Sequence, residues 1–166
     1  MLKLYLDSST VLKRYIKEPG TQTTDIIFDK AETGELSLAI SLWNIGEVLG
    51  VLDERRRRKW LTEEEFAQSL KNLADELVKL MRLRVLEFIP ILTSLIIETW
   101  SLITSHRIYE ADALQITSCI YSQSNAIISS HKKLIETCKK LGLTAYHIQD
   151  DKEELESFIK SRRKTT

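Results

Sequence analysis

The sequence has few of the features that mark disulfide-rich, zinc-binding or membrane-spanning proteins. Its 166 residues include only two cysteines, Cys119 and Cys138, and these form no C-x-x-C pair. A disulfide framework and a zinc site are therefore disfavoured, and we expect two reduced thiols. The first residues turn polar too early for a signal peptide, and the apolar stretch at 88–97 is interrupted by Pro90, Thr93 and Ser94. We expect a cytoplasmic protein.

An excess of charge of one sign is also missing. Lys plus Arg and Asp plus Glu both number 24, so the formal net charge is zero. No overall basic field can attract nucleic acid, and any such binding must depend on local patches. With 43% hydrophobic and 29% charged residues, the composition is that of a globular protein rather than a disordered one. The length suits one domain.

What the sequence does contain is a regular alternation of short apolar strands and helical segments. Strands are expected at 2–6, 36–40, 85–88, 126–128 and 144–148, with helices between them. This pattern predicts parallel strands joined by right-handed helical crossovers, in an α/β three-layer sandwich. We expect residues 1–150 to form the main domain, and 151–166 to add a C-terminal helix and a frayed tail to the same domain.

Three helices carry more specific expectations. Ser41 should cap the helix that follows it, and Thr62 with Glu65 should form a capping box at the start of a helix reaching about residue 82. Gly46 and Gly50 each lower the stability of this helix by about 1 kcal/mol relative to alanine. Because this cost is accepted twice, we expect another backbone to pack closely against the helix there. The expected buried positions are Leu42, Ile45, Leu49 and Leu52 in the first helix, Leu70, Leu73, Leu77 and Leu80 in the second, and Ala113, Leu114, Thr117 and Ile120 in a helix at 110–121.

Three carboxylates stand at positions where chemistry is possible. Asp7 directly follows the first strand, where a parallel sheet forms its crevice, although an aspartate there could equally cap a helix. Glu47 lies in mid-helix, where a solvated surface position is the plainer interpretation. Asp112 lies in a first helical turn, where the helix dipole alone favours an acid.

Taken together, the three acids suggest a metal site. They occur at a strand end and in two helices that this architecture can bring to one crevice. Clustered carboxylates repel each other and require a cation to neutralise them. Oxygen ligands without a Cys or His cluster indicate Mg²⁺ or Mn²⁺. Such ions activate water and neutralise charge developing on a phosphate.

Four stretches resemble, in order, the motifs of the PIN-domain family of VapC-type toxins. They are residues 4–13 (LYLDSSTVLK), 41–49 (SLWNIGEVL), 110–119 (EADALQITSC) and 126–143, which begins AIISSHKKL. The resemblance extends over residues 2–148. It implies a five-stranded parallel sheet with helices on both sides and Mg²⁺- or Mn²⁺-dependent cleavage of RNA. It also implies a homodimer and, for toxins, a small antitoxin bound over the site.

The resemblance assigns roles to individual residues. Asp7, Glu47 and Asp112 would be the catalytic, metal-binding acids, and Ser9 the hydroxyl beside the first of them. The last motif usually carries a fourth acid, and His131 stands there in this chain. His131 could serve Mn²⁺ better than Mg²⁺, or it could cap or line the helix start. We favour the lining role, beside Ser129 and Ser130.

A basic run follows the helix that carries Glu47. It consists of Arg55, Arg56, Arg57, Arg58 and Lys59. Cations stabilise a helix C-terminus, but five in a row exceed that need. We expect either a phosphate-binding patch for RNA or a surface for an acidic antitoxin. The cluster at 162–164 is better interpreted as a solvated end.

Two other classes of protein share part of this sequence pattern. A phosphatase of the haloacid dehalogenase type requires a second aspartate two residues after the first, and Ser9 stands there. The stronger rival is a degenerate PIN module that binds RNA or a protein partner without cutting, because the fourth acid is missing.

Overall fold

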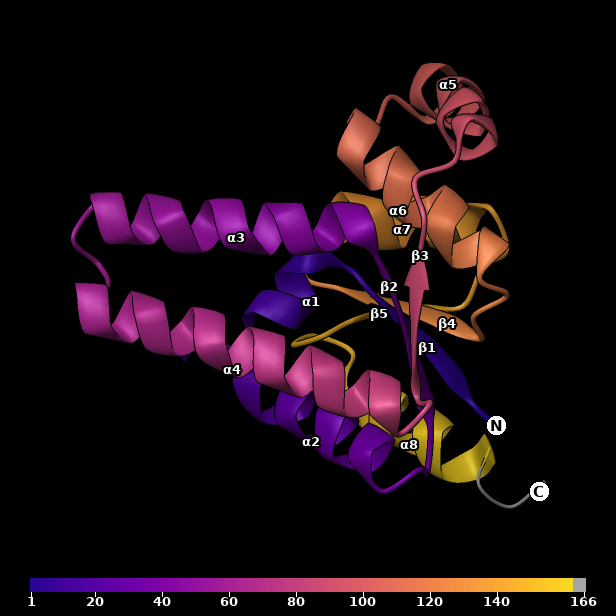
Figure 1. Ribbon diagram of the computed structural model, residues 1–166. Helices are drawn as coiled ribbons and strands as arrows, with labels where there is room; N and C mark the ends of the chain where they lie inside the picture. The colour runs from indigo at the N-terminus through magenta and orange to yellow at the C-terminus, as the bar shows by residue number, and fades with distance from the viewer. Residues whose placement is uncertain (163–166) are drawn as a thin grey trace.

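A parallel sheet of five strands forms the centre of the computed structural model, which describes residues 1–162 (Figure 1). The strands are β1 (Lys3–Leu6), β2 (Ser37–Ser41), β3 (Leu86–Ile89), β4 (Ala126–Ser129) and β5 (Ala145–His147). The helices are α1 (Ser8–Leu12), α2 (Thr21–Glu32), α3 (Leu42–Arg57), α4 (Glu63–Arg82), α5 (Thr93–His106), α6 (Glu110–Tyr121), α7 (Lys132–Lys140) and α8 (Lys152–Arg162).

The strand order places β1 at the middle of the sheet. The order is β3-β2-β1-β4-β5, and every neighbouring pair is parallel. Successive side chains of a strand point to opposite faces, so Leu4 and Leu6 enter one core while Tyr5 enters the other. Both faces must therefore be covered, which explains why the inner strands are almost wholly apolar.

The helices cover the two faces unequally. Residues of α1, α2, α3, α4 and α8 share a core with Leu4 and Leu6, whereas α5, α6 and α7 share the other core with Tyr5. In Figure 1, α3 and α4 extend together beyond the sheet, and α5 stands away from it on the opposite side. The expected α/β three-layer sandwich with a five-stranded parallel sheet is confirmed.

Several local expectations also match the structure. Thr62 accepts from the Glu65 amide while the Glu65 side chain accepts from the Thr62 amide, which completes the capping box. Ser41 caps α3 by accepting from the amide of Trp43. In α4, Leu73, Leu77 and Leu80 are buried and Leu70 packs against them. Both cysteines are free and buried.

The expected apolar stripe of α3 is correct for Leu52, which is buried, and Ile45, which packs against the core, but wrong for Leu42 and Leu49. Leu42 and Leu49 are 51% and 41% exposed, whereas Val48 and Leu52 are buried together with the polar Asn44. This helix carries apolar residues around most of its circumference, so periodicity alone could not select the face that the sheet would cover. Ile120 in α6 is likewise half exposed rather than in the core.

The expected close approach of a second backbone to α3 is also wrong. A Cβ atom added at Gly46 or Gly50 would meet nothing within 4 Å. Both glycines lie on the exposed side of the helix, and nothing in the structure explains them. Helix α1 begins at Ser8, because Asp7 caps it.

No helix within residues 1–162 combines the length and apolar character needed to cross a membrane. The charged cluster at 162–164 and the tail beyond it lie largely outside the described residues, and only α8 to Arg162 is described.

Candidate active site

Four elements bring polar side chains to the edge where β1, β2 and β4 end. Asp7 follows β1, the Ser41-capped helix α3 carries Glu47, and Ser129 ends β4 just before His131. Asp112 comes from the first turn of α6. The carboxyl ends of parallel strands meet at one edge of a sheet, and ligand sites of α/β proteins form there.

Asp7 is buried and held by three donors. Its carboxylate accepts hydrogen bonds from Ser9 Oγ at 2.8 and 2.9 Å, from Ser129 Oγ at 2.6 Å and from the Thr10 amide at 2.9 Å. The bond from Thr10 is the helix cap that the sequence allowed as an alternative. Capping does not exclude a metal-binding role, because a carboxylate has lone pairs enough to cap a helix and accept a further ligand.

Asp112 is paired with His131. The Asp112 carboxylate is 9% exposed as a residue, and its Oδ1 lies 3.2 Å from His131 Nδ1. The His131 side chain is half exposed, and its backbone amide donates to Ser129 Oγ, which itself donates to Asp7. His131 occupies the N-cap position of α7 but makes no side-chain capping bond. The position therefore fits the lining role.

Glu47 is held by a residue that the sequence analysis did not select. Its Oε2 accepts from Gln115 Nε2 at 3.0 Å, and Gln115 Oε1 in turn accepts from the Tyr5 hydroxyl at 2.7 Å. Both Gln115 and Tyr5 are buried. The sequence signal that could have pointed to Gln115 is a glutamine in the middle of a helix whose other central positions are apolar or small.

All three acids contribute to the pKa shift of His131. The hydrogen bond to Asp112 raises the pKa of His131 above its usual value, burial opposes this, and the charges of Asp7, Asp112 and Glu47 add to the rise. Burial raises the pKa of the nearby Cys138 thiol to about 12, with contributions from the charges of Asp112 and Asp7. These contributions agree with the placement of the three carboxylates at the same edge of the sheet.

The charge balance of the site favours a cation. Within residues 1–162, neither Asp7, Glu47 nor Asp112 forms an ion pair with a lysine or arginine. In the same part of the chain, no three His, Cys, Asp or Glu side chains are grouped as ligands of a metal ion. The acids lie at the same edge of the sheet, and each is hydrogen-bonded to its own neighbour: Asp7 to Ser9 and Ser129, Glu47 to Gln115, and Asp112 to His131. As a donor set, three carboxylates and a hydroxyl fit a hard cation such as Mg²⁺ or Mn²⁺.

The basic run at the end of α3 is largely engaged within the chain. Its ion pairs join Arg55 to Glu18, Arg56 and Arg57 to Asp53, and Arg58 to Glu54. Arg57 and Arg58 are the more exposed, at 67% and 55% of their side chains. RNA phosphates would have to compete with these carboxylates.

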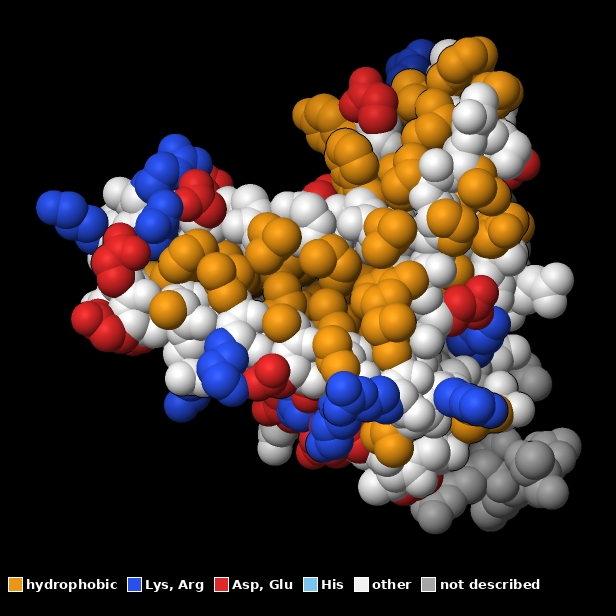
Figure 2. All heavy atoms as spheres, viewed as in Figure 1, with side chains coloured by type: hydrophobic (Ala, Val, Ile, Leu, Met, Phe, Trp, Pro, Cys, Tyr) orange, Lys and Arg blue, Asp and Glu red, His pale blue; other side chains and the backbone are white. Residues whose placement is uncertain are grey.

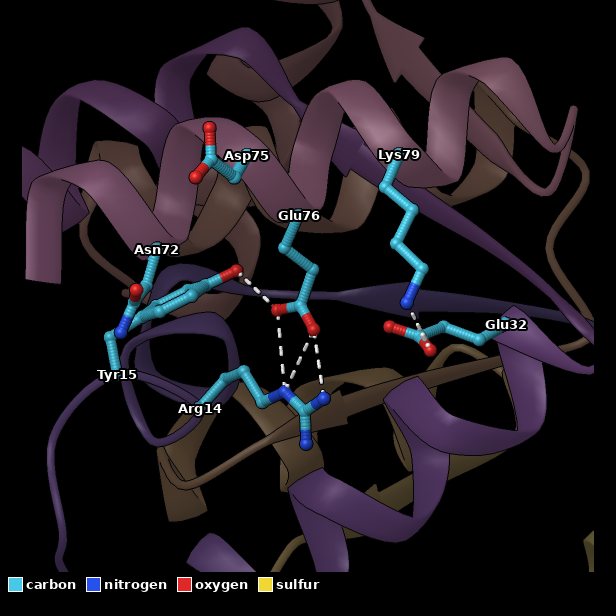
Figure 3. Close-up of a pocket in the computed structure, with 7 residues that line it drawn as sticks. All are labelled: Arg14, Tyr15, Glu32, Asn72, Asp75, Glu76 and Lys79. Atoms are coloured by element: carbon cyan, nitrogen blue, oxygen red, sulfur yellow. Dashed lines mark hydrogen bonds and ion pairs between the residues drawn. The ribbon is translucent and has the colours of Figure 1, made fainter.

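A separate pocket lies between α2, α4 and the turn after α1 (Figure 3). It is lined by Arg14, Tyr15, Glu32, Asn72, Asp75, Glu76 and Lys79. Glu76 accepts from Arg14 and Tyr15, and Lys79 pairs with Glu32. None of the three candidate acids lines it, and its charges largely neutralise one another. It is best interpreted as a contact between helices.

Comparison with known proteins identifies the fold but not the function. The sequence matches no family model and no curated protein. Among solved structures, PAE2754 of Pyrobaculum aerophilum is similar with a TM-score of 0.65 at 14% identity, over 99% of this chain and 91% of that one. VapC20 of Mycobacterium tuberculosis, a toxin that cleaves the sarcin-ricin loop, is similar with a TM-score of 0.54 at 12% identity, over 75% and 86%. The chain thus has a PIN-like, VapC-like fold.

Proposed function

We propose that this protein is a metal-dependent endoribonuclease that cleaves RNA phosphodiesters, and that it is the toxin of a toxin–antitoxin pair in the cytoplasm. One observation carries the proposal. Asp112 contacts His131 at the carboxyl edge of a PIN-like sheet, the charges of Asp7 and Glu47 also act on that imidazole, and no lysine or arginine of the described chain pairs with the three acids. The similarity to VapC20 supports a nuclease in general terms.

Asp7, Glu47 and Asp112 would hold the Mg²⁺ or Mn²⁺ ion. When bound, such an ion supplies an activated water and stabilises charge on the phosphate. The protein's part is orientation: Ser9 and Ser129 fix the Asp7 carboxylate through short hydrogen bonds. Ser130 belongs to the same wall, because its backbone amide donates to Ser9 Oγ at 3.0 Å. His131, beside Asp112, offsets part of the negative charge when protonated.

The alternative is a degenerate PIN module that binds RNA or a protein without cleaving. The observation that favours it is His131, which stands where the fourth acid of the resemblance is expected and pairs with Asp112. An imidazole there supplies one negative charge fewer to a second ion.

Cleavage of single-stranded RNA with Mn²⁺ separates the two functions. We expect the wild type to cleave and Asp7→Asn to lose activity by at least about 100-fold, because a ligand to the ion is lost. Asp75→Asn is the matched control, since Asp75 is exposed on α4 and its ion pair within residues 1–162 is with Lys71. If wild type and Asp7→Asn bind RNA equally but leave it intact at high protein concentration, the non-catalytic module is correct.

RNA contact by the basic run is a further part of the proposal. Each phosphate neutralised on a single strand contributes about −0.7 to the slope of log K against log salt. Replacing Arg57 and Arg58 by glutamine should therefore flatten that slope by roughly 1.4. Replacing Lys71 and Lys160, which form similar surface pairs on other helices, is the control. An unchanged slope in the arginine variant would exclude the run as an RNA contact.

A homodimer and a bound antitoxin complete the proposal. Large apolar side chains are exposed on α5 (Ile96, Ile97 and Trp100) and on α3 (Leu42, Trp43 and Leu49). Figure 2 shows hydrophobic side chains gathered over α5 and along the α3–α4 pair. A monomer rarely leaves so much apolar surface in contact with water. We assign the α5 surface to a second copy of the chain, and leave the α3–α4 surface to the antitoxin.

A further inference from the structure

The hydrogen bond to Glu47 is the end of a buried chain of three residues. Tyr5 on β1 donates to Gln115 on α6, which donates to Glu47 on α3. Tyr5 is fully buried and Gln115 is 3% exposed. These two hydrogen bonds therefore connect the central strand of the sheet, through the core beneath the site, to one of the three acids.

The chemistry of the three groups permits only one arrangement. A carboxylate can only accept hydrogen bonds, so Glu47 requires the amide nitrogen of Gln115. The Gln115 oxygen is then left to face Tyr5, which must donate. Tyr5 is fully buried and its hydroxyl lies 2.7 Å from Gln115 Oε1, so the hydroxyl proton is directed at that oxygen. Both ends of the chain select the same orientation of the amide.

These two hydrogen bonds hold Glu47 without neutralising it. Gln115 occupies Oε2, and the described part of the structure shows no second hydrogen bond to the Glu47 carboxylate and no cationic partner for it. A single neutral donor fixes the direction of the side chain and leaves most of its lone pairs available. Outer partners of this kind orient metal ligands in known metal sites.

Resting on the nuclease function proposed above, we propose that Gln115 and Tyr5 are positioning residues that aim the Glu47 carboxylate at the divalent ion. Gln115 acts by direct contact with Glu47, and Tyr5 acts only through Gln115. Neither residue touches the ion or the RNA. The consequence is a division of effects: loss of Gln115 weakens ion binding, and loss of Tyr5 matters only while Gln115 is present.

The test measures Mn²⁺ affinity from the paramagnetic resonance signal of the free ion, together with the melting temperature without metal. Gln115→Met should raise the Mn²⁺ dissociation constant about 10- to 100-fold, the usual cost of an outer-shell partner. Tyr5→Phe should raise it by a smaller factor, and Tyr5→Phe with Gln115→Met should match Gln115→Met alone. Thr117→Val, which removes a buried hydroxyl that donates to Leu114 O of its own helix, is the control and should leave the affinity unchanged.

The melting temperature separates positioning from mere packing. Gln115→Met removes the Gln115 acceptor of the Tyr5 hydroxyl, which leaves Ser118 and Asn44 as its hydrogen-bonding neighbours in the described structure, whereas the double variant removes both polar groups and should recover stability. Recovered stability with ion affinity still lost supports the proposal. Wild-type Mn²⁺ affinity in Gln115→Met overturns the proposal, and so does a further loss of Mn²⁺ affinity when Tyr5→Phe is added to it. If Gln115→Met does not fold, Tyr5→Phe alone decides, because the proposal requires this variant to bind Mn²⁺ more weakly than the wild type. If the wild type binds no Mn²⁺, the proposed function fails and the positioning proposal fails with it. If the wild type binds Mn²⁺, Asp7→Asn does not, and Gln115→Met binds it as the wild type does, only the positioning role is overturned.

Discussion

Arg55 shows how a residue of the proposed RNA-binding run is used by the fold, through the contact it shares with Lys13. Lys13 is 5% exposed, and its Nζ lies 2.8 Å from Glu18 Oε1, while Glu18 Oε2 accepts from Arg55 at 2.8 Å. A buried ammonium group requires a partner. Glu18 supplies it and at the same time ties the start of the basic run to the loop after α1. Arg55 therefore has a structural role whether or not RNA binds nearby.

We expect Glu18→Gln to destabilise the protein in a pH-dependent manner. Burial alone would raise the pKa of Glu18, but Lys13 and Arg55 outweigh it, and the pKa lies below its ordinary value of 4.5. A carboxyl whose pKa is lowered by folding contributes stability above its unfolded pKa and loses it as the pH falls through the folded pKa.

Urea unfolding of wild type and Glu18→Gln at pH 7 and near pH 3 measures this contribution. At pH 7 the variant should lose roughly 1–3 kcal/mol, because Lys13 is left without its charged partner. The difference should shrink as the pH falls below about 4.5, where the unfolded carboxyl takes up a proton. A difference of the same size at both pH values would show that the charge of Glu18 is not responsible.

At the scale of elements, α4 is attached to the rest of the molecule by a polar contact as well as by leucines. Glu76 accepts from Arg14 Nε and Nη2 at 3.0 and 2.8 Å and from the Tyr15 hydroxyl at 2.7 Å (Figure 3). Arg14 also reaches Asp25 of α2 at 2.9 Å. Because α4 packs beside α3, this contact helps to place the helix that carries Glu47.

A double-mutant cycle with Arg14→Met and Glu76→Gln tests this attachment. Each single variant should lose about 1–3 kcal/mol, because each leaves a partly buried polar group without its main partner. The double variant should lose less than the sum, with a coupling of about 0.5–3 kcal/mol between the two sites. Strict additivity in urea unfolding would mean that the two side chains stabilise the protein independently.

The elements themselves were largely predictable, whereas the orientation of α3 was not. The bounds of α6 and the capping box of α4 follow from local signals, and the structure has both. The buried face of α3 depends on which neighbours cover it, and Leu42 and Leu49 show that the covered face was misjudged. Gln115 was overlooked for a similar reason, because its two partners are 110 and 68 residues away in the chain.

At the scale of the whole molecule, the surface is unevenly apolar. Helix α5 stands away from the sheet (Figure 1) and exposes Ile97 and Trp100 to 51% and 60%. The sequence indicated the layers of the sandwich, because alternating strands and helices restrict the topology. It could not show which apolar residues remain uncovered, since both kinds look alike in a sequence.

We expect the protein to be a dimer that Trp100→Glu dissociates. Large aromatic side chains at the centre of an interface commonly contribute 2 kcal/mol or more, so the dimer dissociation constant should rise at least about 30-fold. Analytical ultracentrifugation over a concentration series measures it. Trp60→Glu is the matched control, since Trp60 is 65% exposed but lies between α3 and α4. A wild type that is monomeric at every concentration, or equal effects of both variants, would refute the assignment to α5.

The central claim is that Asp7, Glu47 and Asp112, far apart in the chain, hold one divalent ion between them. A crystal grown or soaked with Mn²⁺ tests it most directly, because anomalous scattering locates manganese independently of the protein atoms. We predict a peak at the carboxyl edge of β1, with oxygen ligands from all three residues at about 2.1 Å, as for small hard cations. Manganese bound elsewhere, or a fully loaded crystal in which any one of the three acids points away from the ion, would contradict it.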